Sequence, residues 1–159
     1  MTLVTRPGHG PTDLDPADLA IVRALADDGR MSFTDLAAVV GLSTSAVHQR
    51  VRRLEERGVV RGYRAEIDPE SVGLALTAFI AITPIDPADP DDLPERLAPL
   101  AAVASCYSVA GDANYLLQVR VATPGDLEAL VAEIRSVAHV TTRTTVVLST
   151  PFEGRGPRP

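Results

Sequence analysis

Residues 36–56 read LAAVVGLSTSAVHQRVRRLEE, and they contain two apolar helical patterns that meet at Gly41. Glycine commonly ends a helix in the left-handed conformation, and Ser43 is a favoured N-cap for the helix that follows. Two short helices joined by such a tight turn predict a helix-turn-helix.

Capping residues and glycines set the expected limits of the helices in this half of the chain. A proline directly after Asp15 supports the first start, because proline suits the first position of a helix. The expected helices run, in order, from Asp15 to Gly29, from Ser32 to Gly41 and from Ser43 to Gly58. A short strand is expected over residues 59–68.

The third helix is amphipathic in a way that suits DNA. At about 100° per residue, Val47, Val51 and Leu54 fall within about 60° of one another and predict a buried stripe. The opposite side carries polar and basic residues, namely Ser45, His48, Gln49, Arg52 and Arg53. Glutamine bonds adenine edges, arginine bonds guanine, and serine bonds base or phosphate, so this face can read a major groove.

The candidate DNA contacts divide by role. The expected base readers are Ser45, His48 and Gln49. The expected phosphate contacts are Arg50, Arg52, Arg53 and Arg61, together with Ser43 and Thr44 at the helix N-terminus, where backbone N–H groups attract anions. The alternative is a solvated helix face on which Arg52 and Arg53 pair with Glu55 and Glu56.

Charge is unevenly distributed along the chain. The 159 residues carry a formal net charge of −6, yet residues 43–64 contain six arginines against two glutamates, a net +4. A local basic patch can neutralise phosphate whatever the net charge of the whole protein.

Composition narrows the class of protein. Hydrophobic residues make up 45% and charged residues 23%, which is typical of one or two globular domains. No apolar run is long enough to span a membrane, and no leader-like segment is seen, so we expect a cytoplasmic, nucleoid-associated protein without a membrane partner. His9, His48 and His139 have no metal or triad spacing, so no catalytic residue, metal or cofactor is expected. Cys106 is expected to be a small buried apolar residue.

The second half predicts a different architecture. Expected strands cover residues 76–82, 105–110, 115–121 and 140–149, and expected helices cover 89–102 and 124–137. The order β-α-β-β-α-β is typical of a ferredoxin-like sandwich, so the fold class is α+β. Both helices would cover one face of the sheet, and the other face would need a partner.

The chain resembles the Lrp/AsnC (feast/famine) transcription regulators, in particular actinobacterial members. The motifs that carry the likeness are Leu14-Asp15, Asp28-Gly29-Arg30 and residues 36–43, 51–55, 58–63 and 110–115. The resemblance implies a winged-helix-like DNA-binding domain and a RAM/ACT-like effector domain. The expected layout is a flexible arm (1–12), the helix-turn-helix domain (13–62), a linker strand or hinge (63–74), the effector and oligomerisation domain (75–150) and a tail (151–159).

The resemblance also implies an amino-acid effector bound between subunits, sheets that pair face to face in a homodimer, and dimers that assemble into octamers. The implied effector residues are Ala110, Gly111, Asp112, Asn114 and Tyr115, with Thr141, Thr142, Arg143, Thr144 and Thr145 from a neighbouring subunit. Asp112 would hold the α-ammonium group. Without the resemblance, residues 111–114 predict only a hairpin turn. Asn114 and Ala110 stand where the family often has Asp and Ser or Thr, which leaves the effector open.

We therefore expect a sequence-specific transcription regulator of amino-acid metabolism that responds to an amino acid. One alternative is an architectural DNA-binding protein without an effector. Another is a metabolite-binding module or enzyme built on the ferredoxin-like half. The operator, the sign of regulation and the size of the assembly stay open.

Overall fold

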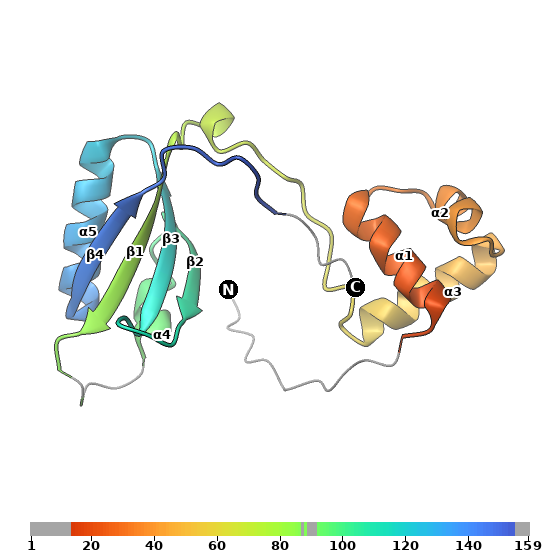
Figure 1. Ribbon diagram of the computed structural model, residues 1–159, viewed down its shortest axis with the longest axis horizontal. Helices are drawn as coiled ribbons and strands as arrows, with labels where there is room; N and C mark the ends of the chain where they lie inside the picture. Colours follow the sequence, from red (N-terminus) through yellow and green to blue (C-terminus); the bar gives the residue numbers. More distant parts are fainter. Residues whose placement is uncertain (1–13, 87, 89–91, 155–159) are drawn as a thin grey trace. The chain divides into compact units, whose positions relative to one another are not determined.

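The structure is a computed structural model that describes residues 14–86, 88 and 92–154 (Figure 1). The chain forms two compact units that divide between Glu66 and Ile67. The predicted arm over residues 1–12 and residues 155–159 of the predicted tail lie outside the described residues.

The N-terminal unit is helical. Its helices are α1 (Pro16–Asp27), α2 (Phe33–Val40) and α3 (Thr44–Glu56). The predicted N-caps Asp15, Ser32 and Ser43 each accept a hydrogen bond from the backbone three residues on, which satisfies an N–H group that the helix leaves free. Gly41 ends α2 with φ of 68°, the left-handed conformation predicted for it.

The core of this unit joins the apolar sides of the helices. The predicted stripe Val47, Val51 and Leu54 is almost fully buried. It packs in one cluster with Ile21 and Leu36. The back of α3 is therefore fixed against α1 and α2, and its other side is left outside the core.

The strand expected over residues 59–68 is wrong. Val59 and Val60 turn back onto α3, where both backbone N–H groups donate to the carbonyl of Leu54. Both side chains pack against the helical core. Residues 61–68 pair with no strand in the described part of the chain, so they form no sheet.

In the described part of the C-terminal unit, strands form one antiparallel sheet in the order β2-β3-β1-β4. The strands are β1 (Leu76–Pro84), β2 (Val103–Ser108), β3 (Tyr115–Val121) and β4 (Val140–Val146). The helices are α4 (Leu93–Leu97) and α5 (Pro124–Ala138), and a 3-10 turn η1 (Glu70–Val72) precedes β1. This is the predicted βαββαβ arrangement, and the α+β fold class is confirmed.

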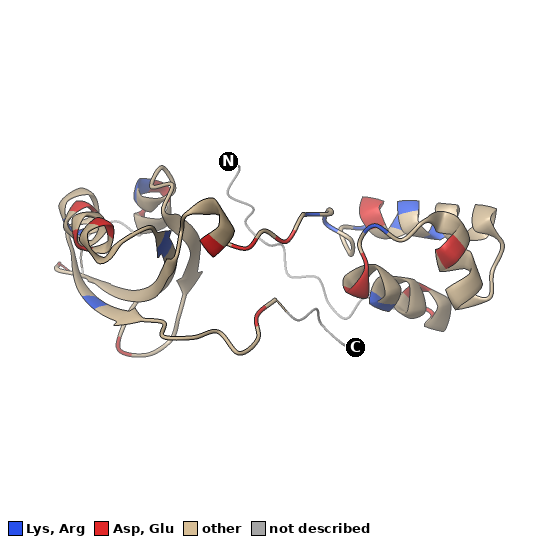
Figure 2. Ribbon diagram, turned by 90° about the horizontal axis from the view of Figure 1, so that it is seen from above, with Lys and Arg blue, Asp and Glu red and all other residues tan. Residues whose placement is uncertain are grey.

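Both helices cover the same side of the sheet, as Figure 2 shows from above. Burial alternates along β1 and β3, so that Ile80, Ile82 and Leu117 are fully enclosed beneath the helices. The intervening residues, such as Phe79 and Leu116, are only half-buried on the opposite side. The bare sheet face predicted from the sequence is therefore present in this chain.

Several boundaries differ from the prediction. Within the described residues, the helix expected over 89–102 is only α4, which ends at Leu97; Pro99 follows the cap residue Ala98 and has no N–H group with which to continue the helix. Strand β2 begins and ends two residues earlier than expected, and β4 ends at Val146, where its pairing with β1 ends.

Cys106 is exposed, so the prediction that it is buried is wrong. It pairs with the buried Leu117, but β2 is an edge strand of the sheet. A position on an edge strand receives neighbours from one side only, which leaves this thiol uncovered.

The cap of α5 provides a test of this local structure. Thr123 accepts a hydrogen bond from Asp126 N–H, and the Asp126 carboxylate accepts one from Thr123 N–H, which is a capping box. We expect Thr123→Ala to lower the free energy of unfolding by about 1 kcal/mol. Thr123→Ser, which keeps the hydroxyl, is the control and should stay close to the parent in urea denaturation. Equal losses in both variants would contradict the cap.

Candidate DNA interface and effector site

The outer side of α3 presents the predicted base readers to solvent. Ser45, His48 and Gln49 are all exposed, and so are Ser43 and Thr44 at the start of the helix. The first turn of α3 contains no acidic residue. Because a helix N-terminus carries partial positive charge, this end of α3 favours an approaching phosphate.

His48 is held by a contact that the sequence did not predict. Its ring lies edge-on to the ring of Phe33, with the ring centroids 4.9 Å apart. Phe33 is the first residue of α2 and is partly exposed. Because Phe33 lies 15 positions away in the sequence, spacing within α3 gave no signal of this support.

The arginines of α3 have different surroundings. Arg52 bonds Glu56 at 2.8 Å, one turn along the helix. This ion pair is one of those expected if the outer side of α3 is only a solvated helix face. Such an exposed i,i+4 pair, however, stabilises a helix by only about 0.3–0.5 kcal/mol. Arg53 is exposed and makes no side-chain hydrogen bond or ion pair with another described residue.

Arg50 points elsewhere. Its guanidinium bonds the carboxylates of Asp15 and Asp18 at the start of α1. The guanidinium of Arg50 holds the pKa of Asp15 below its usual value, and the two carboxylates raise the pKa of Arg50. The guanidinium of Arg50, predicted as a phosphate contact, is thus engaged within the domain.

The basic surface continues past α3 into the linker. Arg57, Arg61 and Arg64 are exposed. Figure 2 shows the linker blue next to the N-terminal unit and red further along, where Glu66 and Asp68 lie. Positive charge is therefore confined to the part of the linker that adjoins the helix-turn-helix.

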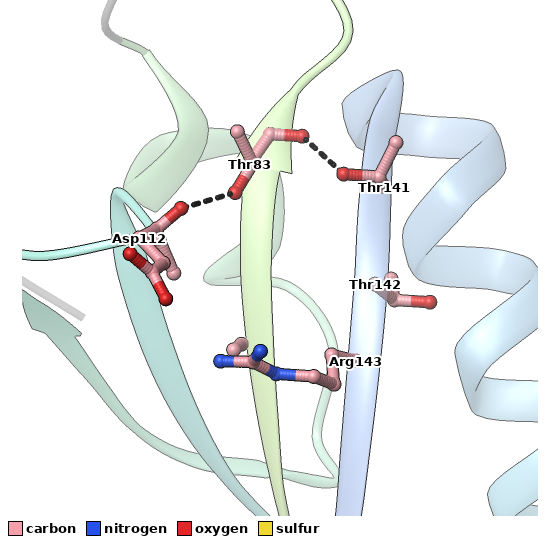
Figure 3. A pocket seen from close by; sticks show the side chains of 7 residues that line it. Thr83, Asp112, Thr141, Thr142 and Arg143 are labelled. Atoms are coloured by element: carbon pink, nitrogen blue, oxygen red, sulfur yellow. Dashed lines mark hydrogen bonds between the residues drawn. The ribbon is translucent and has the colours of Figure 1, made fainter.

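A hollow of about 160 Å³ lies on the bare face of the sheet (Figure 3). It is lined by Ala81, Thr83, Asp112, Ala113, Thr141, Thr142 and Arg143. Strand β1 lies between β3 and β4, and its register places Ala81 opposite Arg143 and Thr83 opposite Thr141. The turn after β2 and the start of β4 thus meet across β1 within a single chain.

Hydrogen bonds hold the walls of the hollow. The hydroxyl of Thr83 donates to the carbonyl of Asp112 at 3.4 Å, and the hydroxyl of Thr141 donates to the carbonyl of Thr83 at 3.3 Å. Asn114 N–H donates to the carbonyl of Ile82 at 3.1 Å. These bonds fix the turn at residues 109–114 against β1.

The two charged side chains of the hollow are available to a ligand. Asp112 and Arg143 are both exposed. Neither the Asp112 carboxylate nor the Arg143 guanidinium bonds another described residue. Figure 3 shows Arg143 extending across β1 on the same side of the sheet as Asp112. The hollow therefore combines a free anion with a free cation.

The hollow brings together only part of the predicted effector set. Asp112, Thr141, Thr142 and Arg143 line it, whereas Ala110, Gly111, Asn114, Tyr115, Thr144 and Thr145 are not among its lining residues. Tyr115 is buried in the core beneath the helices, because it pairs with the inward-facing Ile82. Thr144 pairs with Ile80 on that same side, and the Thr142 hydroxyl accepts a hydrogen bond from Arg135 of α5.

Sequence reasoning missed Ala81, Thr83 and Ala113. Strand alternation places Ala81 and Thr83 on the uncovered face of β1 once the buried Ile80 and Ile82 are known, but residues 78–82 are apolar throughout and do not show which face is covered. Their position beside Asp112 and Arg143 depends on the pairing of strands far apart in the chain, which the alternation does not specify.

Among the described residues, no group of three or more His, Cys, Asp or Glu side chains could hold a metal ion. None of the helices described here combines the length and the hydropathy needed to cross a bilayer.

Comparisons with known proteins agree with this division of the chain. Residues 14–61 match the family model for winged helix-turn-helix DNA-binding, and residues 77–157 match the Lrp/AsnC ligand binding domain. Over 142 residues the chain is 55% identical to the HTH-type transcriptional regulator LrpA of Mycobacterium tuberculosis, covering 89% of this chain and 95% of that protein.

Solved structures show the same likeness. The crystal structure of the M. tuberculosis leucine response regulatory protein LrpA has a TM-score of 0.83 at 53% identity, covering 92% of this chain and 100% of that one. The feast or famine regulatory protein from M. tuberculosis, complexed with L-methionine, has a TM-score of 0.89 at 54% identity, covering 91% and 99%.

The turn beside the hollow gives a test of its conformation. Gly111 has φ of 148°, in the region that favours glycine, although a Cβ there would meet no atom within 4 Å. We expect Gly111→Ala to lower the free energy of unfolding by at least about 1 kcal/mol through backbone strain alone. Gly125→Ala, inside helix α5 at ordinary φ, is the matched control and should be neutral or stabilise by up to about 1 kcal/mol. Urea denaturation measures both, and the same change in both variants would contradict the strain.

Proposed function

The chain belongs to the Lrp/AsnC family of transcriptional regulators, with a DNA-binding and a ligand-binding domain, and from this premise we propose that it binds specific DNA sequences and responds to an amino acid. It is not an enzyme. The observation that carries the proposal is the exposed, basic outer side of α3, opposite an apolar stripe that is locked into the core.

We place α3 in the major groove. A helix of this diameter fits the groove, and its first turns carry the small residues Ser43, Thr44 and Ser45, which permit close approach. Gln49 and His48, one turn further on, are the longer candidate base readers. The ring of Phe33 limits the positions that His48 can adopt, which favours a defined contact over a mobile one.

The proposed phosphate contacts flank this reading surface. Arg53 and Arg61 are exposed, and Arg52 is held by Glu56 in a weak surface pair that phosphate can replace. Each phosphate that a basic side chain neutralises releases counterions, so binding should weaken steeply as salt is added.

The proposed effector site is the hollow on the sheet. A free amino acid carries an ammonium and a carboxylate on one carbon, and the hollow offers Asp112 for the first and Arg143 for the second. Thr83 and Thr141 add hydroxyl groups beside them. The complex of a 54% identical regulator with L-methionine supports an amino acid as the class of ligand, and with it a role in amino-acid metabolism.

We further propose that the chain acts as a homo-oligomer. The bare face carries Phe79, Leu116 and the exposed Tyr107, and a second copy of the sheet would cover these apolar groups. The hollow opens on this same face, so a neighbouring copy can complete the effector site between subunits. Dimers assembled into an octamer on the nucleoid are the assembly that the family resemblance implies.

Salt dependence tests the DNA proposal. Arg53→Ala should weaken binding to all duplexes and reduce the slope of log K against log salt by about one, because one phosphate contact is lost. Glu56→Gln should strengthen binding, because it frees Arg52. Fluorescence anisotropy over a salt series measures both, with Glu133→Gln on α5 of the other unit as the control. An unchanged slope in Arg53→Ala would contradict its role.

Thermal stability tests the effector proposal. Amino acids are screened one by one for a rise in the melting temperature of the protein, beginning with L-methionine. A ligand present at about 100-fold its Kd should raise the free energy of unfolding by about 2.7 kcal/mol. Asp112→Asn and Arg143→Gln should each abolish that rise. Glu133→Gln, on α5 and away from the hollow, should keep it. If no amino acid stabilises the parent protein, the effector proposal fails and an architectural role is favoured.

A further inference from the structure

An ion-pair network ties the middle of α3 to the start of α1. One nitrogen of Arg50 donates to both carboxylates, at 2.7 Å to Asp18 and also to Asp15. Asp15 is at the same time the N-cap of α1, where it accepts from Asp18 N–H at 2.8 Å. The cap of α1 and the proposed reading helix α3 are therefore parts of one hydrogen-bonded group.

The network is partly enclosed. The side chains of Arg50 and Asp18 are 24% and 11% exposed, and in the described part of the chain Asp18 is the only charged residue that is buried. Because a buried carboxylate without a partner is strongly unfavourable, Asp18 needs Arg50 more than an exposed acid would.

The direction of Arg50 also separates it from the DNA-facing residues. On α3, Arg50 lies about 60° from Val47, at the edge of the buried stripe, whereas Gln49 lies on the opposite side. Its contacts are with α1, and they leave the exposed side of α3 to Ser45, His48 and Gln49.

Buried apolar side chains of α1 and α3, among them Ile21, Val47 and Leu54, belong to one cluster. Apolar packing is not directional, so it allows one helix to turn or slide on the other more readily than a charged hydrogen bond does. A groove-reading helix needs its side chains held within a fraction of an ångström and a few degrees. The hydrogen bonds of Arg50 to Asp15 and Asp18 are directional, so they can fix the angle of α3 on α1 in a way that apolar packing cannot.

We infer that Arg50 is a positioning residue for sequence reading: by binding Asp15 and Asp18 it fixes how α3 is presented to the groove, and it does not contact phosphate. This inference rests on the proposed DNA-binding function. Arg50 and Arg53, both on α3, should therefore differ in their effect on affinity. Loss of the phosphate contact of Arg53 should weaken binding to all duplexes alike, whereas loss of positioning by Arg50 should weaken binding only to duplexes with the recognised sequence.

The experiment compares two duplexes. One is enriched by the parent protein from a randomised pool, and the other is its scrambled counterpart of equal length and composition. Arg50→Met should lower affinity for the enriched duplex by about tenfold, comparable to the loss of one base contact, and leave the scrambled duplex and the salt slope nearly unchanged. Arg50→Lys, which keeps a positive donor, should recover part of the discrimination.

A double variant separates positioning from stability. Asp18→Leu with Arg50→Met removes the buried carboxylate together with its partly enclosed partner, and replacing a buried ion pair by apolar residues is commonly neutral or stabilising. We expect its melting temperature to return towards that of the parent while discrimination between the duplexes stays low. Return of discrimination together with melting temperature would overturn the inference, because Arg50 would then act only through stability.

Two other results are decisive. A salt slope that falls by about one in Arg50→Met, with equal losses on both duplexes, would show a phosphate contact and overturn the inference. If the parent protein enriches no sequence from the pool, the proposed sequence-specific function itself fails, and the inference about Arg50 fails with it.

Discussion

Burial of apolar side chains on one side only of each helix and strand is the constraint on which the rest of this structure depends. In α3 it encloses Val47, Val51 and Leu54, and in β1 it encloses Ile80 and Ile82. Burying such a side chain fully stabilises the fold by about 1.5–3 kcal/mol, far more than an exposed ion pair does. Each element therefore has one orientation, and its remaining side is free to carry binding chemistry.

Local features of this arrangement could be predicted from the sequence. Caps act over three residues, so Asp15, Ser32 and Ser43 identified the helix starts correctly. The apolar period of 3.6 identified the buried stripe of α3, and the β-α-β-β-α-β order of the elements indicated a sheet with one uncovered face. The exposed position of Gln49 followed from the same wheel, because Gln49 lies opposite the buried stripe.

Features that depend on distant partners could not be predicted in this way. The partners of Arg50 lie 32 and 35 residues away in the sequence. Its place at the edge of the buried stripe of α3 was nevertheless a signal that its side chain does not belong to the exposed side of the helix. Residues 59–68 have the composition of a strand but lack a neighbouring strand in the described chain. The hollow needs the order β3-β1-β4 to bring Asp112 to Arg143, and sequence periodicity does not specify strand order.

The linker is bound to α3 at its start and forms a local turn before β1. The Tyr63 hydroxyl donates to Glu55 of α3 at 3.0 Å, and burial beside this carboxylate raises the pKa of Tyr63. At the other end, Ser71 N–H donates to the Asp68 carboxylate at 3.0 Å, beside the turn that leads into β1. Coupling between sites requires a physical connection whose states both ligands bias. Within one chain the linker provides such a connection, and it begins beyond α3, the helix that Arg50 binds to the start of α1.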